Sequence, residues 1–259
     1  MNPTRPDPTS PSGSLWRWPR VVAHRGGGTL APENTLAAFD VGARYGHRMV
    51  EFDVKLSADD VAFLLHDPDV ARTSDGAGAA VDLRYDEIAA FDAGNWFDPR
   101  FAGARMPTLA EVAACCRAHN LAANIEIKPS PGTERETGRR VAELTTQLWA
   151  DHPATPLFSS FSFDALAAAR DAAPLIPRGL LASELPADWR EQAAQLQCVA
   201  LHLNHRRLTA PLVQQIKDAG LCVFAYTVNE PDRALELANW GVDAICTDRI
   251  DLIGTDFLK

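Results

Sequence analysis

The chain has 259 residues, 46% of them hydrophobic and 23% charged, which is enough for one large domain with a well-buried core. Its formal net charge of −9 argues against nucleic acid or an anionic membrane as the main partner. An anionic small molecule is not excluded, because salt screens the global charge and a local cluster of Arg and Lys can still attract it.

The cysteines and the ends of the chain indicate the compartment. The five cysteines are odd in number and include no Cys-x-x-Cys, so they fit neither a disulfide framework nor a zinc site. Free thiols in a reducing cytoplasm are the expected state. The first residues lack the apolar segment of a secretory signal, and no stretch approaches the ~20 apolar residues of a membrane span. We therefore expect a cytoplasmic protein without a membrane-spanning segment.

Residues 1–19 are rich in Pro and Ser, and we predict that they form a disordered leader. A single domain is predicted to follow over residues 20–259. At the junction, "LWRWPR" carries two tryptophans that could dock on this domain.

Short β-branched runs alternate with longer Ala/Leu-rich amphipathic runs along the predicted domain. The predicted strands are 21–24, 49–56, 121–128, 156–161, 178–183, 198–204, 221–228 and 242–248. The predicted helices are 34–45, 108–119, 134–150, 163–172, 188–195, 209–219 and 231–240. Thr108 precedes Glu111 by three residues, which is typical of a helix start, and Gly220 and Gly241 follow two predicted helix ends.

This alternation predicts a parallel sheet, and eight strands in roughly 240 residues match a (β/α)8 TIM barrel. A doubly wound open sheet remains the alternative, because periodicity does not distinguish the two. Residues 67–107 break the rhythm after the second strand, with Gly, Asp, Pro, Trp and Phe in place of a plain helix. We predict that this insertion caps one end of the barrel.

Two predicted strands carry charges in mid-run. In "MVEFDVKL", Glu51 and Asp53 share one face of the strand, and in "LAANIEIK", Glu126 and Lys128 do so. Parallel strands covered on both faces usually read as continuous apolar runs. We therefore expect these charges to point into the barrel near its C-terminal mouth.

Three converging carboxylates, Glu51, Asp53 and Glu126, would repel one another unless a positive charge compensates them. A divalent cation is the simplest compensation, and all-oxygen ligands suit Mg²⁺ or Ca²⁺, with Mn²⁺ also possible. The alternative is a salt-bridge network with Arg25 and Lys128. Two cations against three anions would leave that network unbalanced.

His24 and Arg25 end the first predicted strand, and His66 ends the apolar stretch "VAFLLH". Catalytic groups of TIM barrels lie at the C-terminal ends of strands. Two imidazoles suit a general acid and a general base, and the fixed charges of Arg25 and Lys128 suit a phosphate. The glycines at 26–28 would let a substrate approach the backbone closely.

Several motifs together resemble the glycerophosphodiester phosphodiesterase family, over about residues 20–252. They are "HRGGGTLAPENT", "EFDVKLSADDVAFLLHDPDVARTSDGAG", "MPTLAEV", "NIEIKP", "AYTVNE" and "GVDAICTDRID". The resemblance implies a TIM barrel with a small insertion after the second strand. It also implies hydrolysis of glycerophosphodiesters to glycerol 3-phosphate and an alcohol.

The resemblance further implies roles for seven residues: metal ligation by Glu51, Asp53 and Glu126, acid–base catalysis by His24 and His66, and phosphate contacts from Arg25 and Lys128. The sequence does not decide which histidine is the acid, and His66 is slightly favoured. One departure is Tyr226 in "AYTVNE", where the family more often has Trp. Tyr226 and Phe161 are the candidate aromatic walls of the substrate pocket. The preferred alcohol, the preferred metal and the oligomeric state are not defined.

Other polar residues have simpler predicted roles. His47 is expected to be solvated, and either His202 or His205 could reach the barrel mouth. Asn34 is expected to cap a helix, whereas Glu33 could lie near the metal. Asp248 is expected to cap the last helix or to pair with Arg249, although it ends the eighth strand at the catalytic face.

Three other functions share part of this set of residues or of this fold. A phospholipase D-like lyase would keep the metal and both histidines and release a cyclic phosphate, but the related lyases are secreted and disulfide-bonded. A non-catalytic barrel that binds metal or phosphate would be favoured if one of the histidines or carboxylates of this set were missing, and none is. A zinc amidohydrolase barrel would require His-x-His on the first strand, where this chain has "AHRG".

Overall fold

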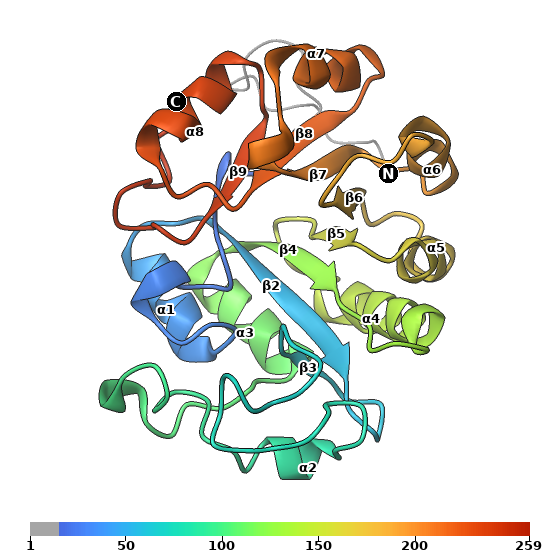
Figure 1. The fold of residues 1–259 in the computed structure, drawn as a ribbon. Coiled ribbons are helices and arrows are strands. Elements are labelled where there is room, and N and C mark those ends of the chain that lie inside the picture. The colour runs from blue at the N-terminus through green and yellow to red at the C-terminus, as the bar shows by residue number, and fades with distance from the viewer. Residues whose placement is uncertain (1–15) are drawn as a thin grey trace.

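A computed structural model describes residues 16–259 (Figure 1). The parallel strands are β1 (Val21–Ala23), β2 (Met49–Leu56), β4 (Ala122–Ile127), β5 (Leu157–Ser160), β6 (Arg178–Ala182), β7 (Ala200–Asn204), β8 (Cys222–Tyr226) and β9 (Ala244–Thr247). Within the described part of the chain they pair in the order β1-β9-β8-β7-β6-β5-β4-β2. Ala23 of β1 pairs with Val50 of β2 and closes the ring. The TIM barrel is thus confirmed, and the open sheet is excluded.

The helices surround the barrel (Figure 1). They are α1 (Leu36–Arg44), α3 (Leu109–His119), α4 (Glu134–Leu148), α5 (Phe163–Ala172), α6 (Trp189–Gln195), α7 (Ala210–Asp218) and α8 (Pro231–Asn239). The Thr108 and Glu111 side chains form the expected capping box of α3. Gly220 and Gly241 adopt positive φ after α7 and α8, as their predicted places at helix ends require. No helix among the described residues is long and apolar enough to cross a membrane.

The two faces of β2 differ as the sequence predicted. Phe52 points outward and packs against Phe39 of α1, with ring centroids 5.4 Å apart. Glu51 and Asp53 alternate with these apolar residues and are buried, so they point into the barrel. Asp53 pairs directly with Glu126 of β4, and this register brings the carboxylates of two strands together.

A tryptophan closes the opposite, N-terminal end of the barrel. Trp16 is only 4% exposed and belongs to an apolar cluster that includes Met49, Ala122 and Ala244, the first residues of their strands. The indole nitrogen of Trp18 donates to the Thr155 carbonyl over 2.7 Å. Docking by the two tryptophans is therefore confirmed, and the last residues of the predicted leader belong to the packed domain. The rest of that leader, 1–15, lies outside the described residues.

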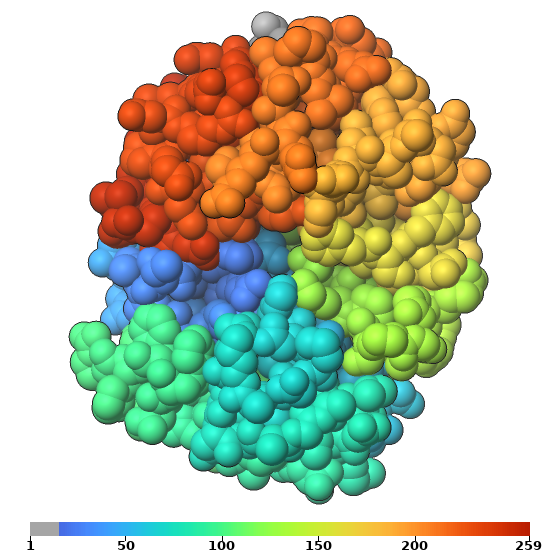
Figure 2. Space-filling view, in the orientation of Figure 1, coloured from blue at the N-terminus to red at the C-terminus, as the bar shows by residue number. Residues whose placement is uncertain are grey.

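An unpredicted strand, β3 (Ala62–Leu64), precedes the insertion and pairs antiparallel with β2. The insertion, residues 67–107, contains α2 (Tyr85–Ile88) and a 3₁₀ turn (Pro99–Phe101). A small apolar core that includes Phe63, Ile88 and Met106 joins the insertion to β3. In Figure 2 the insertion, in teal and green, fills the lower part of the visible face. None of residues 67–107 is among the residues that line the central cavity. That the insertion caps one end of the barrel stays a prediction.

Candidate active site

Three carboxylates converge at the C-terminal mouth of the barrel. Glu51, Asp53 and Glu126 are 5%, 1% and 7% exposed, and each offers an oxygen within 4.8 Å of the others. A cavity of about 180 Å³ opens there, with Glu51 and Glu126 in its lining. The predicted convergence of these side chains is therefore present.

The electrostatics of the group show that its negative charge is only partly compensated by the protein. Burial and the charge of Asp53 raise the pKa of Glu51 to about 8. The same two causes raise the pKa of Glu126. Burial would also raise the pKa of Asp53, but Lys128 and Arg25 outweigh it and leave that pKa lowered. Oxygen ligands with excess negative charge fit a divalent cation such as Mg²⁺ or Ca²⁺.

Two positively charged side chains, Arg25 and Lys128, contact the carboxylates, and their closest contacts are with Asp53 and Glu126. Lys128 Nζ lies 2.9 Å from Glu126 Oε1 and 3.2 Å from Asp53 Oδ1. Arg25 Nε lies 3.5 Å from Asp53 Oδ2. Glu51 accepts instead from the backbone N–H of Arg25, over 3.2 Å. The predicted salt-bridge network thus exists, and Glu51 is the anion that these side chains leave unbalanced.

His24 is oriented by a carboxylate. Its Nδ1 lies 2.5 Å from Asp248 Oδ1, and Asp248 Oδ2 accepts from Asn229 Nδ2 over 3.0 Å. The other ring nitrogen, Nε2, is 3.8 Å from Glu51 Oε2. Burial alone would lower the pKa of His24, but Asp248 and Glu51 outweigh it and leave that pKa raised. The predictions for Asp248 were wrong, since Arg249 pairs with Asp251 and Asp248 holds His24.

His66 has a similar carboxylate partner. Its Nδ1 lies 2.6 Å from Asp67 Oδ1, and the ring lines the cavity. Burial lowers the pKa of His66, and the attraction of Asp53 offsets this only in part. The pKa values of the two histidines at the cavity are therefore shifted in opposite directions.

Arg72 of the insertion joins the two sides of the site. Its Nη1 and Nη2 each lie 2.8 Å from a Glu33 oxygen, and its Nε donates to Asp67. Glu33 in turn accepts from Arg25 Nη1 over 2.5 Å. One guanidinium thus holds the carboxylate that orients His66 and the carboxylate that orients Arg25. Arg72 was not among the predicted site residues, although it lies in the family-like motif "HDPDVARTSDGAG".

Asn34 positions a carboxylate and does not cap a helix, which corrects its predicted role. Its Nδ2 donates to Asp53 Oδ2 over 2.9 Å, and its Oδ1 accepts from the Asp53 backbone N–H over 3.2 Å. Thr35 caps α1 instead. Asn34 and Arg25 have φ values of +58° and +50°, unusual for residues other than glycine. Such conformations concentrate at functional sites, where the surrounding structure enforces them.

The glycines after Arg25 let this turn pack closely against the rest of the protein, whereas the approach of a substrate to the turn stays a prediction. A Cβ on Gly28 would lie 2.1 Å from the Asp248 carbonyl oxygen. A Cβ on Gly26 would lie 2.9 Å from the Phe39 ring. The bare turn therefore lets the chain after β1 lie against the end of β9 and against α1.

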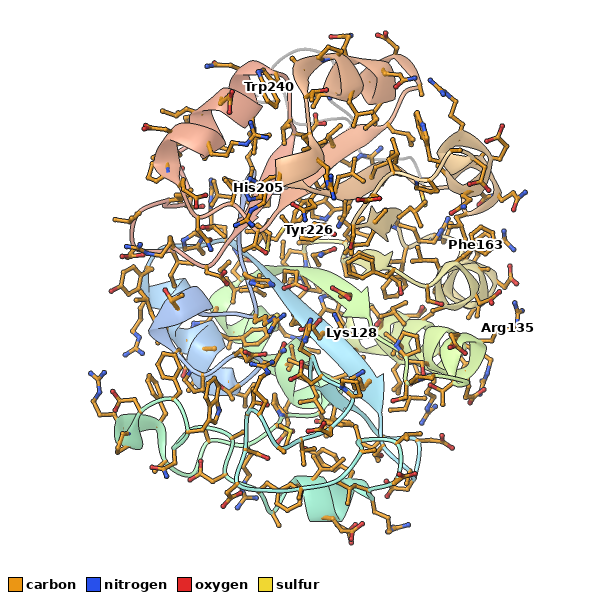
Figure 3. The ribbon with its side chains drawn as sticks, viewed as in Figure 1. Lys128, Arg135, Phe163, His205, Tyr226 and Trp240 are labelled. Carbon is orange, nitrogen blue, oxygen red and sulfur yellow. The ribbon has the colours of Figure 1, made fainter. Side chains whose placement is uncertain are left out.

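An aromatic wall lines the cavity. The rings of Phe161 and Tyr226 meet edge to face with centroids 6.1 Å apart, and Lys128 Nζ is 5.8 Å from the Phe161 ring centre. Tyr226 donates its hydroxyl proton to the Ala182 carbonyl over 3.1 Å. Lys128 and Tyr226 lie toward the centre of the view, whereas Trp240 lies at its periphery (Figure 3).

The remaining histidines stay outside the cavity lining. His47 is only 2% exposed, with Nε2 3.4 Å from the Ile250 carbonyl, so the prediction that it is solvated was wrong. His202 is fully buried and stacks on Phe224 with centroids 4.4 Å apart. Burial lowers the pKa of His202 to about 3. Neither His202 nor His205 lines the cavity.

Comparisons with known proteins agree with this geometry. The model of the glycerophosphoryl diester phosphodiesterase family matches residues 24–252. A glycerophosphodiester phosphodiesterase of Caldanaerobacter subterraneus is 33% identical over 88% of this chain and 93% of its own. A phosphodiesterase of Oleispira antarctica, solved in complex with the product sn-glycerol-3-phosphate, is 35% identical. It superposes with a TM-score of 0.84 over 89% of this chain and 93% of its own.

A glycerophosphodiester phosphodiesterase of Agrobacterium tumefaciens is 29% identical, with a TM-score of 0.76 over 90% of this chain and 97% of its own. The family model covers most of the chain, and the Caldanaerobacter relative matches it at nearly full length. The chain therefore belongs to the glycerophosphoryl diester phosphodiesterase family and is an enzyme of that family.

Proposed function

We propose that this enzyme hydrolyses glycerophosphodiesters to glycerol 3-phosphate and an alcohol, with a divalent cation and two histidines. The observation that carries the proposal is the grouping of three carboxylates, two fixed cations and two carboxylate-paired histidines around one cavity. The glycerol 3-phosphate found in the Oleispira phosphodiesterase supports the substrate class.

Glu51, Asp53 and Glu126 are the residues that would hold the cation, Mg²⁺ or Ca²⁺, with Mn²⁺ possible. When bound, such an ion supplies charge stabilisation to phosphate oxygens. Asn34 fixes the position of Asp53, and Lys128 fixes that of Glu126. The ligand oxygens are thus preorganised by neighbouring side chains.

Arg25 and Lys128 are the proposed phosphate contacts. Both are largely buried and held in place by carboxylates, so little further side-chain ordering is needed on binding. Their fixed positive charge favours the extra negative charge that phosphorus oxygens acquire in the transition state. Glu33 and Arg72 orient the Arg25 guanidinium from behind.

His24 and His66 divide the proton transfers. His24, with Nδ1 held by Asp248, presents Nε2 at the mouth and can accept a proton there. His66, with Nδ1 on Asp67, can donate from Nε2 to the leaving alcohol. This assignment, with His24 as base and His66 as acid, agrees with the preference from the sequence.

The first nucleophile is either water or the substrate's own 2-hydroxyl. The glycerol 2-hydroxyl lies next to the phosphate, so its attack would give a transient cyclic phosphate that water then opens. A lyase would stop at that cyclic product. Phosphorus NMR during turnover separates these routes, and a substrate analogue hydrolysed equally fast without its 2-hydroxyl would favour direct attack by water.

The cavity favours small substrates. Its volume of about 180 Å³ and its wall of Phe161 and Tyr226 suit a deacylated diester better than an intact bilayer lipid. Comparable rates on glycerophosphocholine and on phosphatidylcholine vesicles would contradict this preference. The cytoplasmic location stays a prediction, with all five cysteines free in the structure.

An assay coupled to glycerol-3-phosphate dehydrogenase tests the proposal. Choline, ethanolamine and glycerol diesters are compared with and without EDTA. We expect release of glycerol 3-phosphate that EDTA abolishes and Mg²⁺, Ca²⁺ or Mn²⁺ restores. Binding of metal without turnover of any diester would instead favour a non-catalytic barrel.

A further inference from the structure

A second set of potential metal ligands lies at the same mouth. His24, Glu51 and Cys246 each offer one ligand atom, and these atoms lie within 4.8 Å of one another. They come from adjacent parts of the barrel, because β1 pairs with both β9 and β2. We propose that this set binds a thiophilic divalent ion such as Zn²⁺, and that the bound ion inhibits the enzyme.

The donor atoms separate this set from the all-oxygen group. Glu51, Asp53 and Glu126 suit hard ions such as Mg²⁺ and Ca²⁺. An imidazole, a thiolate and a carboxylate together suit Zn²⁺, which takes three protein ligands and leaves a fourth position open in catalytic-type sites. Cys246 is only 1% exposed but lines the cavity, so an ion that enters the cavity can reach it.

The orientation of His24 is the one that metal-binding histidines usually have. Its Nδ1 is held by Asp248, and Asp248 is held by Asn229. The remaining nitrogen, Nε2, is the one that lies 3.8 Å from Glu51. A carboxylate on the far side of the ring fixes the tautomer and raises the basicity of the ligand nitrogen.

Inhibition follows from two shared groups. Glu51 belongs to both ligand sets, so a thiophilic ion competes with Mg²⁺ or Ca²⁺ for it. Such an ion also takes the lone pair of His24 Nε2, and the Cys246 thiol releases its proton to solvent as the bond forms. Binding is independent of the reaction, whereas inhibition rests on the proposed function of His24.

A cluster at the surface is a second possible site for a thiophilic ion, and the test has to eliminate it. Asp40 of α1 and Cys115 and His119 of α3 also place ligand atoms within 4.8 Å of one another. His119 Nε2 already lies 2.8 Å from Asp40 Oδ1 in a largely exposed pair. A thiolate signal could arise there as well, so every measurement uses protein that carries Cys115→Ser.

The test titrates Co²⁺ into chelator-treated, full-length Cys115→Ser protein without substrate. A sulfur-to-cobalt charge-transfer band in the near ultraviolet reports thiolate ligation, and an ion held by oxygen alone gives none. We expect a saturable band that disappears when Cys246→Ser is added. The matched control is Cys115→Ser with Cys222→Ser, because Cys222 is also buried in the barrel interior. That control should keep the band.

Cadmium NMR of the Cys115→Ser protein gives a second readout that does not depend on the folding of a Cys246 variant. We expect a thiolate-shifted cadmium signal. Zn²⁺ should also inhibit Mg²⁺-supported turnover of Cys115→Ser, and Cys246→Ser should raise the required Zn²⁺ concentration roughly tenfold or more, each variant scaled to its own uninhibited rate.

Absence of the cobalt band, its persistence without Cys246, or a cadmium signal typical of oxygen ligands alone would overturn the inference. Its failure is distinguishable from that of the proposed function. A band in protein that hydrolyses no diester refutes the function and retains the ion site. Hydrolysis of a diester by protein that gives no cobalt band refutes the ion site and retains the proposed function.

Discussion

The two ends of the barrel are built from the same strands but have opposite characters. At the N-terminal end, the first residues of several strands, such as Met49 of β2 and Ala244 of β9, pack with Trp16 into an apolar plug. At the C-terminal end, Glu51, Asp53 and Glu126 gather charge in a cavity. The two ends therefore differ in what they contribute. Apolar packing at the N-terminal end stabilises the fold, whereas the buried like charges at the C-terminal end cost folding free energy and form the candidate active site.

The largest expected effect is at the C-terminal end. Replacing His24 or His66 by Ala should lower kcat by roughly 10²–10⁴-fold, because each would remove a proton-transfer group. Circular dichroism and melting temperature should stay close to wild type. A diester with a good leaving alcohol should rescue the acid variant, His66→Ala, and not His24→Ala. Rescue of His24→Ala alone would reverse the assignment.

The opposite end should respond in stability. Trp16→Ala should lower the free energy of unfolding by about 3–5 kcal/mol, because it removes a buried indole from the plug. Urea denaturation measures this change, and kcat of the folded fraction should remain nearly unchanged. Loss of kcat without loss of stability would show that the two ends are not separable in this way.

Arg72 tests how far the catalytic region extends into the insertion. Arg72→Gln should lower kcat by roughly 10–100-fold, the usual effect of removing an outer partner, because Asp67 and Glu33 lose their shared donor. Arg72→Lys should recover only part of the rate, since an ammonium cannot bridge two carboxylates with the guanidinium geometry. Arg139→Gln is the matched control, as Arg139 also bridges two carboxylates but on the exposed face of α4. An equal loss in the control would contradict this role.

A smaller effect is expected from His202, on the pH dependence of the free energy of unfolding. Its folded pKa is about 3 and its ordinary value is 6.5, so protonation favours the unfolded chain as pH falls below 6.5. The contribution is absent above pH 6.5 and reaches about 2 kcal/mol of destabilisation at pH 5. His202→Leu should flatten the slope of unfolding free energy between these pH values. An unchanged slope would show that His202 does not titrate in this way.

Much of the fold was predictable because the strand and helix signals are local. The eight parallel strands and seven surrounding helices end within two residues of the predicted bounds. β3 was missed because a three-residue antiparallel strand has too little periodicity to stand out. The small apolar core that includes Phe63, Ile88 and Met106 was not predicted, because it forms between residues distant in sequence that no local pattern brings together.

The seven candidate residues were predictable from charged positions in apolar strands and from the family resemblance. Their partners were not, because Asp248, Asn34 and Arg72 act through contacts between segments distant in sequence. Asn34 looks like a helix cap from its neighbours, and only the fold brings it to Asp53. His47 looked solvated from its place at a helix end, and only packing against the C-terminal segment buries it.

Calorimetric titration of Ca²⁺ or Mg²⁺ into chelator-treated protein tests the central claim most directly, namely that the mouth carboxylates bind one cation that hydrolysis requires. We predict about one ion per chain, with binding strongly weakened by Glu51→Gln and by Asp53→Asn. Asp256→Asn is the control, because Asp256 is an exposed carboxylate that pairs with Lys259 near the C-terminus. Equal binding by all variants, together with full activity of extensively dialysed protein in EDTA, would contradict the account.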